Sequence, residues 1–186
     1  KPFGKPGREY KRWDEAQKAA ERFAALKEAH PRHGEVLLLR GVALARSKKP
    51  GEALPHLTAA AKALKDAASR SLALSEQALC LVTLERADEA AAIFKEIIAT
   101  YPESKLAPDA SFRLGEIAYG KSQWDAALDQ YQKALDLGAG DLEDKVLYKA
   151  GWALRQSAKP IDSADAFAQV AERHPTSPLA IESLYL

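Results

Sequence analysis

Residues 114–135 read LGEIAYGKSQWDAALDQYQKAL, in which the glycine Gly115 stands twelve positions before the alanine Ala127. The same pairing of small residues recurs at a regular distance. The pairs are Gly41 and Ala53, Ala78 and Ala90, Gly115 and Ala127, and Gly151 and Ser163. Successive pairs are 37, 37 and 36 residues apart. A period of this length, without strand-like alternation, indicates a stack of repeated helical units whose function lies on the surface that the stack creates.

The composition favours helices and a substantial core. Hydrophobic residues make up 47% of the 186 residues, and 27 Lys and Arg against 26 Asp and Glu leave a net charge of +1. This balance offers no electrostatic basis for bulk nucleic-acid or membrane binding. No apolar run reaches the roughly 20 residues that a membrane helix needs. The single cysteine, Cys80, lies in an apolar run, so we expect a buried structural thiol.

The pattern predicts a flexible lead over residues 1–7 and one helical array over 8–186. Prolines and glycines mark the boundaries between the expected helices of the array. The expected helices cover 8–30, 34–47, 51–65, 68–85, 87–100, 106–120, 123–137, 142–157, 161–173 and 178 onward. Grouped into units, they predict a partial repeat over 8–33, repeats over 34–70, 71–107, 108–143 and 144–180, and a truncated repeat over 181–186. Both ends are expected to be cut from a longer protein, since the chain starts with Lys1 and stops within an amphipathic pattern.

Small residues on paired helices predict close backbone contact within each unit. We expect Gly115 to face Ala127, so that no side chain separates the two helices. A large residue, such as Phe94, Tyr131 or Phe167, stands four positions after the second small residue of the pair. We expect this large residue to fill the space under the next unit. A leucine in place of Gly115 should therefore overpack the contact.

Several segments resemble the tetratricopeptide repeat family. Leu114-Gly115, Tyr119, Trp124 to Leu128, Tyr131 and Ala134-Leu135 match one such repeat nearly completely. The resemblance implies an all-α, right-handed superhelical solenoid of helix-turn-helix repeats. The departures are Pro2 and Pro6 where a first helix belongs, and Ala78 in place of the glycine.

Two segments at unit boundaries resemble a bacterial subgroup with slightly longer repeats. They are YPESKLA at residues 101–107 and HPTSPLA at residues 174–180. That subgroup includes the TolA-binding accessory protein of the Tol-Pal system and the lipoprotein of the outer-membrane barrel-assembly machinery. The resemblance implies a place in the bacterial periplasm or cell envelope, with the cytoplasm as the alternative.

The first helix of each unit is expected to line a concave groove. Its candidate partner-binding residues are Phe112, Arg113, Glu116, Tyr119, Lys145, Tyr148, Lys149, Trp152, Arg155 and Tyr185. Phe112, Tyr148 and Tyr185 are 36 and 37 residues apart, which predicts an aromatic ladder. The alternative is that Phe112 and Tyr148 pack between neighbouring helices. Arg113, Lys149 and Arg155 are expected to pair with carboxylates on the partner, whereas Trp13 and Trp124 are expected to pack between units.

No pattern for catalysis, a cofactor or a metal stands out, so we expect no enzyme activity and no cofactor. His30 and His33 lie close together without a third suitable ligand nearby. The leading hypothesis is a protein–protein interaction scaffold that binds a partner peptide or domain in the groove. Alternatives are self-assembly through exposed Leu179, Ile181, Leu184 and Leu186, or an accessory segment of a larger enzyme. Single-stranded RNA reading is disfavoured because no continuous basic stripe is present.

Overall fold

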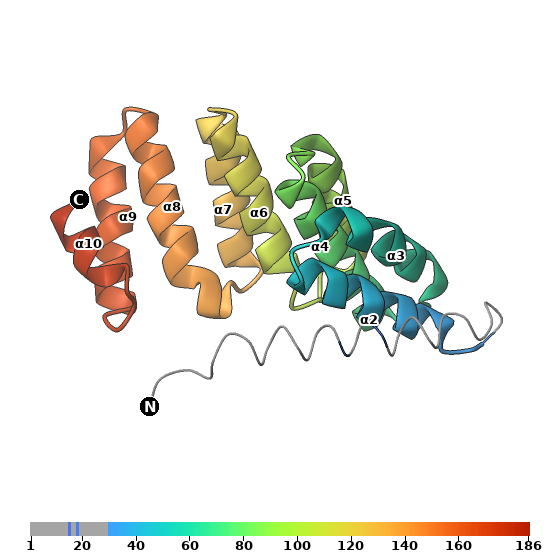
Figure 1. The fold of residues 1–186 in the computed structure, drawn as a ribbon. Coiled ribbons are helices and arrows are strands. Elements are labelled where there is room, and N and C mark those ends of the chain that lie inside the picture. The colour runs from blue at the N-terminus through green and yellow to red at the C-terminus, as the bar shows by residue number, and fades with distance from the viewer. Residues whose placement is uncertain (1–14, 16–17, 19–29) are drawn as a thin grey trace. The chain divides into compact units, whose positions relative to one another are not determined.

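The computed structural model describes residues 15, 18 and 30–186, and residues 30–186 form an array of helices (Figure 1). The elements are α2 (His33–Arg46), α3 (Pro50–Ala63), α4 (Ala67–Thr83), α5 (Ala87–Thr100), α6 (Ala107–Gly120), α7 (Trp124–Asp136), the short 3-10 helix η1 (Gly140–Leu142), α8 (Glu143–Gln156), α9 (Pro160–Arg173) and α10 (Ala180–Tyr185). No strand occurs in this part of the chain, and the expected helix ends differ from the observed ones by no more than two residues. The expected all-α repeat class is confirmed. The predicted lead, first helix and Trp13 lie outside the described residues.

The chain divides into two compact units, Lys1–Ile93 and Phe94–Leu186. In the first unit α2 packs against α3, and α3 packs against α4. In the second unit each helix from α6 to α9 packs against the next helix along the chain. Sequential packing of this kind requires only local connections, as expected for repeated hairpins.

A left-handed residue closes the first helix of each hairpin. Lys48, Glu85, Ser122 and Ala158 have φ angles between 57° and 60°. The following N–H groups donate back to carbonyls five residues earlier, at 2.9–3.0 Å in Lys49–Leu44, Arg86–Leu81, Gln123–Ala118 and Lys159–Leu154. This is the Schellman pattern, which satisfies the last carbonyls of the helix and turns the chain into the next one. The sequence does not predict this Schellman pattern, because none of the four left-handed residues is a glycine.

Glycines on the first helices admit large side chains from the second helices. A Cβ atom at Gly115 would lie 2.4 Å from Cε1 of Tyr131, and one at Gly151 would lie 2.7 Å from Cε1 of Phe167. The large residue therefore lies over the glycine of its own hairpin, a contact that the sequence analysis did not predict. Tyr131 also reaches the next helical repeat, since it belongs to the same buried cluster as Val146 of α8.

A buried hydrogen bond adds to the contact between α8 and α9. The hydroxyl of Ser163 donates to the carbonyl of Gly151 at 2.9 Å. This bond joins one of the pairs of small residues that define the repeat, so the short side chain serves both close approach and hydrogen bonding.

Candidate partner-binding surface

The helix α8 has one buried face and one accessible face. Its buried face consists of Val146, Leu147, Gly151 and Ala153. The opposite face consists of Lys145, Tyr148, Lys149, Trp152 and Arg155, as three- and four-residue steps require. We call the residues Lys145, Tyr148, Trp152 and Arg155 the α8 surface. Lys145 and Arg155 are exposed, and the two aromatic side chains are half-buried.

Three aromatic rings pack edge to face beneath and within the α8 surface. The ring centroids of Tyr148 and Trp152 are 6.3 Å apart. Phe167 of α9 lies 5.6 Å from Tyr148 and 5.8 Å from Trp152. The guanidinium of Arg155 lies over the indole of Trp152, 5.4 Å from the ring centroid. Such edge-to-face and cation–π contacts hold the Trp152 ring in one orientation.

The hydroxyl of Tyr148 connects α8 to α10. It donates to a carboxylate oxygen of Glu182 at 2.7 Å. Burial of the phenol, together with this carboxylate, raises the pKa of Tyr148 above its ordinary value. The phenol is therefore neutral and a hydrogen-bond donor at physiological pH.

The charged side chains of α6 form ion pairs with each other and with Lys149 of α8, which corrects the prediction for Arg113 and Lys149. Arg113 lies 3.4 Å from Asp109 and 2.9 Å from Glu116. Lys149 of α8 lies 3.3 Å from the same Glu116. These two cations already have carboxylate partners, so they are not available in the way the sequence suggested. Lys145 and Arg155 have no carboxylate partner within the described part of the chain.

The predicted aromatic ladder does not form. Phe112 is only 4% exposed and packs on Tyr131 of α7, with ring centroids 5.9 Å apart. Tyr148 packs on Trp152 and Phe167 instead, while Tyr185 is 87% exposed. Phe112 is therefore a core residue and not a surface for a partner. The equal spacing of the three residues did not predict their environment, because equivalent positions in successive repeats can face either the core or solvent.

The remaining aromatic residue of the predicted set, Tyr119, packs near the turn after α6. Its ring lies 4.9 Å from the ring of Trp124, at the start of α7. Tyr119 is half-buried there. The contact closes the α6–α7 hairpin, and it gives Tyr119 a structural role beside its predicted one.

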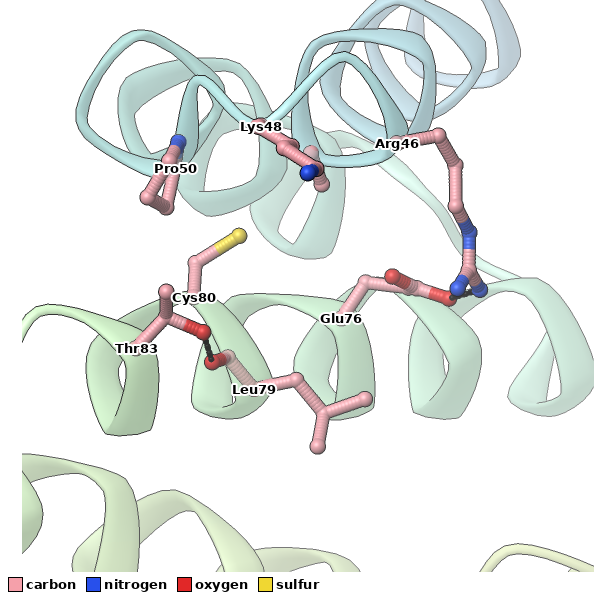
Figure 2. Close-up of a pocket in the computed structure, with 8 residues that line it drawn as sticks. Arg46, Lys48, Pro50, Glu76, Leu79, Cys80 and Thr83 are labelled. Atoms are coloured by element: carbon pink, nitrogen blue, oxygen red, sulfur yellow. Dashed lines mark hydrogen bonds and ion pairs between the residues drawn. The ribbon is translucent and has the colours of Figure 1, made fainter. Parts of the chain in front are cut away.

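A separate pocket opens in the first unit between α2, α3 and α4. It has a volume of about 400 Å³ and is lined by Ala45, Arg46, Lys48, Pro50, Glu76, Leu79, Cys80 and Thr83 (Figure 2). Glu76 is buried and accepts a hydrogen bond from Arg46 at 2.9 Å. Sequence reasoning missed this pocket, although a glutamate at a core position of a helical pattern could have signalled a buried pair.

The thiol of Cys80 in this pocket is poorly suited to nucleophilic chemistry. Burial, followed by the nearby Glu76 carboxylate, raises its pKa to about 11. The thiolate is the reactive form, so little of it exists near neutral pH. The predicted role as a buried structural thiol agrees with its 3% exposure.

We expect alkylation of native Cys80 by iodoacetamide at pH 8 to be roughly 100-fold slower than in denaturant, because a pKa raised to about 11 leaves far less of the reactive thiolate than the ordinary cysteine value does. The rate should keep rising with pH until about pH 11. A Glu76→Gln variant should react faster, since removing the negative charge lowers the pKa. Mass spectrometry of the alkylated protein gives the rate. A native rate that levels off near pH 8.5, the usual cysteine range, would contradict this prediction.

Residues 30–186 contain no group of three His, Cys, Asp or Glu side chains arranged to hold a metal ion. No helix in that part of the chain combines the length and hydropathy needed to span a bilayer.

The sequence and the structure are similar to those of known repeat proteins. Two models of the tetratricopeptide repeat match, one over residues 11–68, 56–105 and 103–141 and the other over residues 145–177. No curated protein matches the sequence. A crystal structure of MamA is 18% identical with a TM-score of 0.76, covering 94% of this chain and 98% of that one. MamA from residue 41 to its end, from Desulfovibrio magneticus RS-1, is 19% identical with a TM-score of 0.74, covering 95% and 99%.

YrrB, described as a tetratricopeptide repeat protein with an unusual peptide-binding site, also has a similar structure. It is 15% identical with a TM-score of 0.72, and the match covers 95% of this chain and 85% of that one. At these identities the likeness establishes the fold.

Proposed function

The chain belongs to the tetratricopeptide repeat family, and we propose that it is a non-enzymatic scaffold that binds a peptide or domain of a partner protein on the α8 surface. Proteins of this family generally mediate protein–protein interactions and are typically non-catalytic. The peptide-binding description of YrrB is consistent with such a role for this chain.

The single observation that supports this surface is the arrangement around Trp152. Its indole is half-buried, and the rings of Tyr148 and Phe167 hold it from the protein side. Arg155 extends over it and is itself exposed. Large aromatic side chains with a rigid support and a neighbouring arginine are the residues that dominate binding energy in protein interfaces.

The test is selection of a random peptide library displayed on phage against the purified chain, followed by affinity measurement for the enriched peptides. We expect the double replacement Trp152→Ala and Tyr148→Ala to weaken binding at least about 30-fold, the effect of a hot spot worth about 2 kcal/mol. Fluorescence anisotropy of labelled peptides gives the affinity.

The matched control is Ile161→Ala on α9, which removes an exposed apolar side chain that is not part of the α8 surface. Circular dichroism and thermal unfolding establish that each variant retains its helices. If folded double-variant protein binds the same peptides as tightly as the unmodified chain, the binding site lies elsewhere.

Self-association is a second candidate, and the apolar side chains of α10 favour it. Ile181 and Leu184 are 71% and 73% exposed, and Tyr185 lies beside them. Such side chains can stack on another copy of the chain. Sedimentation equilibrium should then report oligomers that Leu184→Glu dissociates. A monomer at every accessible concentration would remove this candidate.

We further propose that the protein is located in the bacterial periplasm or cell envelope, because the segments 101–107 and 174–180 resemble those of envelope proteins. Fractionation of cells that express the complete gene tests the proposal. Recovery of the protein in the cytoplasmic fraction alone would overturn it.

A further inference from the structure

The pocket between α2, α3 and α4, which we call the Glu76 pocket, combines a polar floor with an apolar wall. Glu76 and Cys80 are buried at its floor, whereas Arg46 and Lys48 are exposed at its mouth (Figure 2). Its half-buried wall consists of Ala45, Pro50 and Leu79. The volume of about 400 Å³ is near the lower end of the range for ligand pockets, so it suits one side chain rather than a length of peptide.

One oxygen of the Glu76 carboxylate is paired and the other is not. Oε1 accepts a hydrogen bond from Nη2 of Arg46 at 2.9 Å, which ties α2 to α4. No group in the described part of the chain donates to Oε2. Oε2 is not one of the fully enclosed polar atoms that lack a partner, so it borders accessible space. Figure 2 shows one carboxylate oxygen on the side of Cys80, away from Arg46. The pocket thus contains a hydrogen-bond acceptor without a donor.

The neighbouring side chains do not supply the missing donor. Cys80 forms no hydrogen bond with Glu76, and its thiol is neutral because its pKa is raised to about 11. The hydroxyl of Thr83 already donates to the carbonyl of Leu79 at 2.9 Å. Because buried polar groups are normally hydrogen-bonded, an occupant that brings an N–H group would complete the floor. An occupant that brings an acceptor to the same place would be repelled by the carboxylate.

The charges around the pocket favour a neutral occupant. Arg46 balances the negative charge of Glu76. Near the mouth, Lys49 pairs with Glu52 at 3.6 Å, and no carboxylate of the described residues pairs with Lys48. A cationic side chain would therefore meet two cations at the mouth without an excess of negative charge to hold it. A neutral aromatic ring can present its face to the same cations, and indole is the aromatic group that binds cations best.

We propose that the Glu76 pocket receives the indole of a tryptophan in a partner protein. The indole N–H donates to Oε2 of Glu76, the ring lies against the apolar wall, and its face is directed toward Arg46 and Lys48. Indole fits this floor because its nitrogen is a donor only, whereas a phenol also brings lone pairs next to the carboxylate. The site lies in the first compact unit and does not depend on the α8 surface, so each proposal can fail without the other.

Indole and benzofuran test the hydrogen bond, because the two rings have nearly the same shape and differ in an N–H group against an oxygen atom. Titrations of the ¹⁵N-labelled chain, followed by NMR, should shift the amide signals of Leu79, Cys80 and Thr83 most. We expect indole to bind at least about ten-fold more tightly than benzofuran, which leaves the carboxylate oxygen without a donor. Equal affinities, or no indole-dependent shifts at these residues, would overturn the proposal.

The replacement Glu76→Gln tests the carboxylate. It should reduce the preference for indole over benzofuran to about two-fold or less, because a side-chain amide can present either an acceptor or a donor to the ligand. The matched control is Glu35→Gln, which also removes a carboxylate from an arginine, Arg32 at 2.7 Å, but does not line the pocket. This control should keep the full preference. A folded Glu76→Gln variant that keeps it too would contradict the proposed hydrogen bond. If Glu76→Gln does not fold, the comparison of the two ligands on the unmodified chain still decides.

Short peptides separate a protein partner from a small indole compound. Ser-Gly-Trp-Gly-Ser and Ser-Gly-Phe-Gly-Ser, both with blocked ends, differ only in the aromatic residue. We expect the tryptophan peptide to shift the same amide signals, to bind about ten-fold more tightly than the phenylalanine peptide, and to be displaced by indole. If indole binds and the tryptophan peptide does not, the pocket takes a small indole compound and the proposed protein partner is wrong.

Discussion

Replacing Phe167 with alanine is expected to lower the free energy of unfolding by about 4 kcal/mol, the usual cost of removing a fully buried phenylalanine. Phe167 is 1% exposed, lies over Gly151, and contacts the rings of Tyr148 and Trp152. The cavity would therefore open directly beneath the α8 surface. Urea denaturation followed by circular dichroism measures the change in stability, and the fluorescence of the tryptophans should also shift as Trp152 loses its support.

The control for this prediction is Ile161→Ala on the same helix. Ile161 is 76% exposed, so its truncation should change stability by no more than about 0.5 kcal/mol. A similar small loss for Phe167→Ala would mean that the ring is not packed as observed.

The replacement Gly115→Leu is expected to cost about 3 kcal/mol, at the upper end of overpacking effects. Even a Cβ atom at this position would lie 2.4 Å from Cε1 of Tyr131 and 2.6 Å from Cδ1. Tyr131 is fully buried between α6, α7 and the next hairpin, so its ring has little room to move away. Thermal and urea unfolding give the loss.

The matched control is Gly120→Leu at the end of the same helix. Nothing lies within 4 Å of a Cβ atom there, and leucine is the better helix former by up to about 1 kcal/mol. This variant should be as stable as the unmodified chain or slightly more stable. An unchanged melting temperature for Gly115→Leu would contradict the observed contact with Tyr131.

The candidate site could be predicted only in part. The sequence placed Trp152 and Tyr148 on the face of α8 opposite Gly151, and the structure places them there. It could not show that Phe112 packs on Tyr131. Equal spacing of aromatic residues along the sequence does not determine which side of each helix is covered by a neighbouring helix. It also treated Arg113, Lys149 and Arg155 alike, although two of them have carboxylate partners within the chain and Arg155 has none among the described residues.

The pocket lined by Lys48, Glu76 and Cys80 also could be predicted only in part from the sequence. Cys80 could be placed in the core from its apolar neighbours alone. The raised pKa of its thiol depends in part on Glu76, whose carboxylate is held by Arg46 from another helix. A contact across 30 positions of the chain is not visible in a local pattern.

The helices, their order and the close contact between paired helices follow from the sequence by itself. These features depend on short-range periodicity, on prolines at helix starts and on small residues at a constant spacing, all of which are local in the chain. Only the tertiary structure decided which side chains remain available to a partner. Ion pairs and hydrogen bonds such as Lys149–Glu116 and Tyr148–Glu182 join different hairpins, and the energy of each depends on distance and burial that no single segment determines.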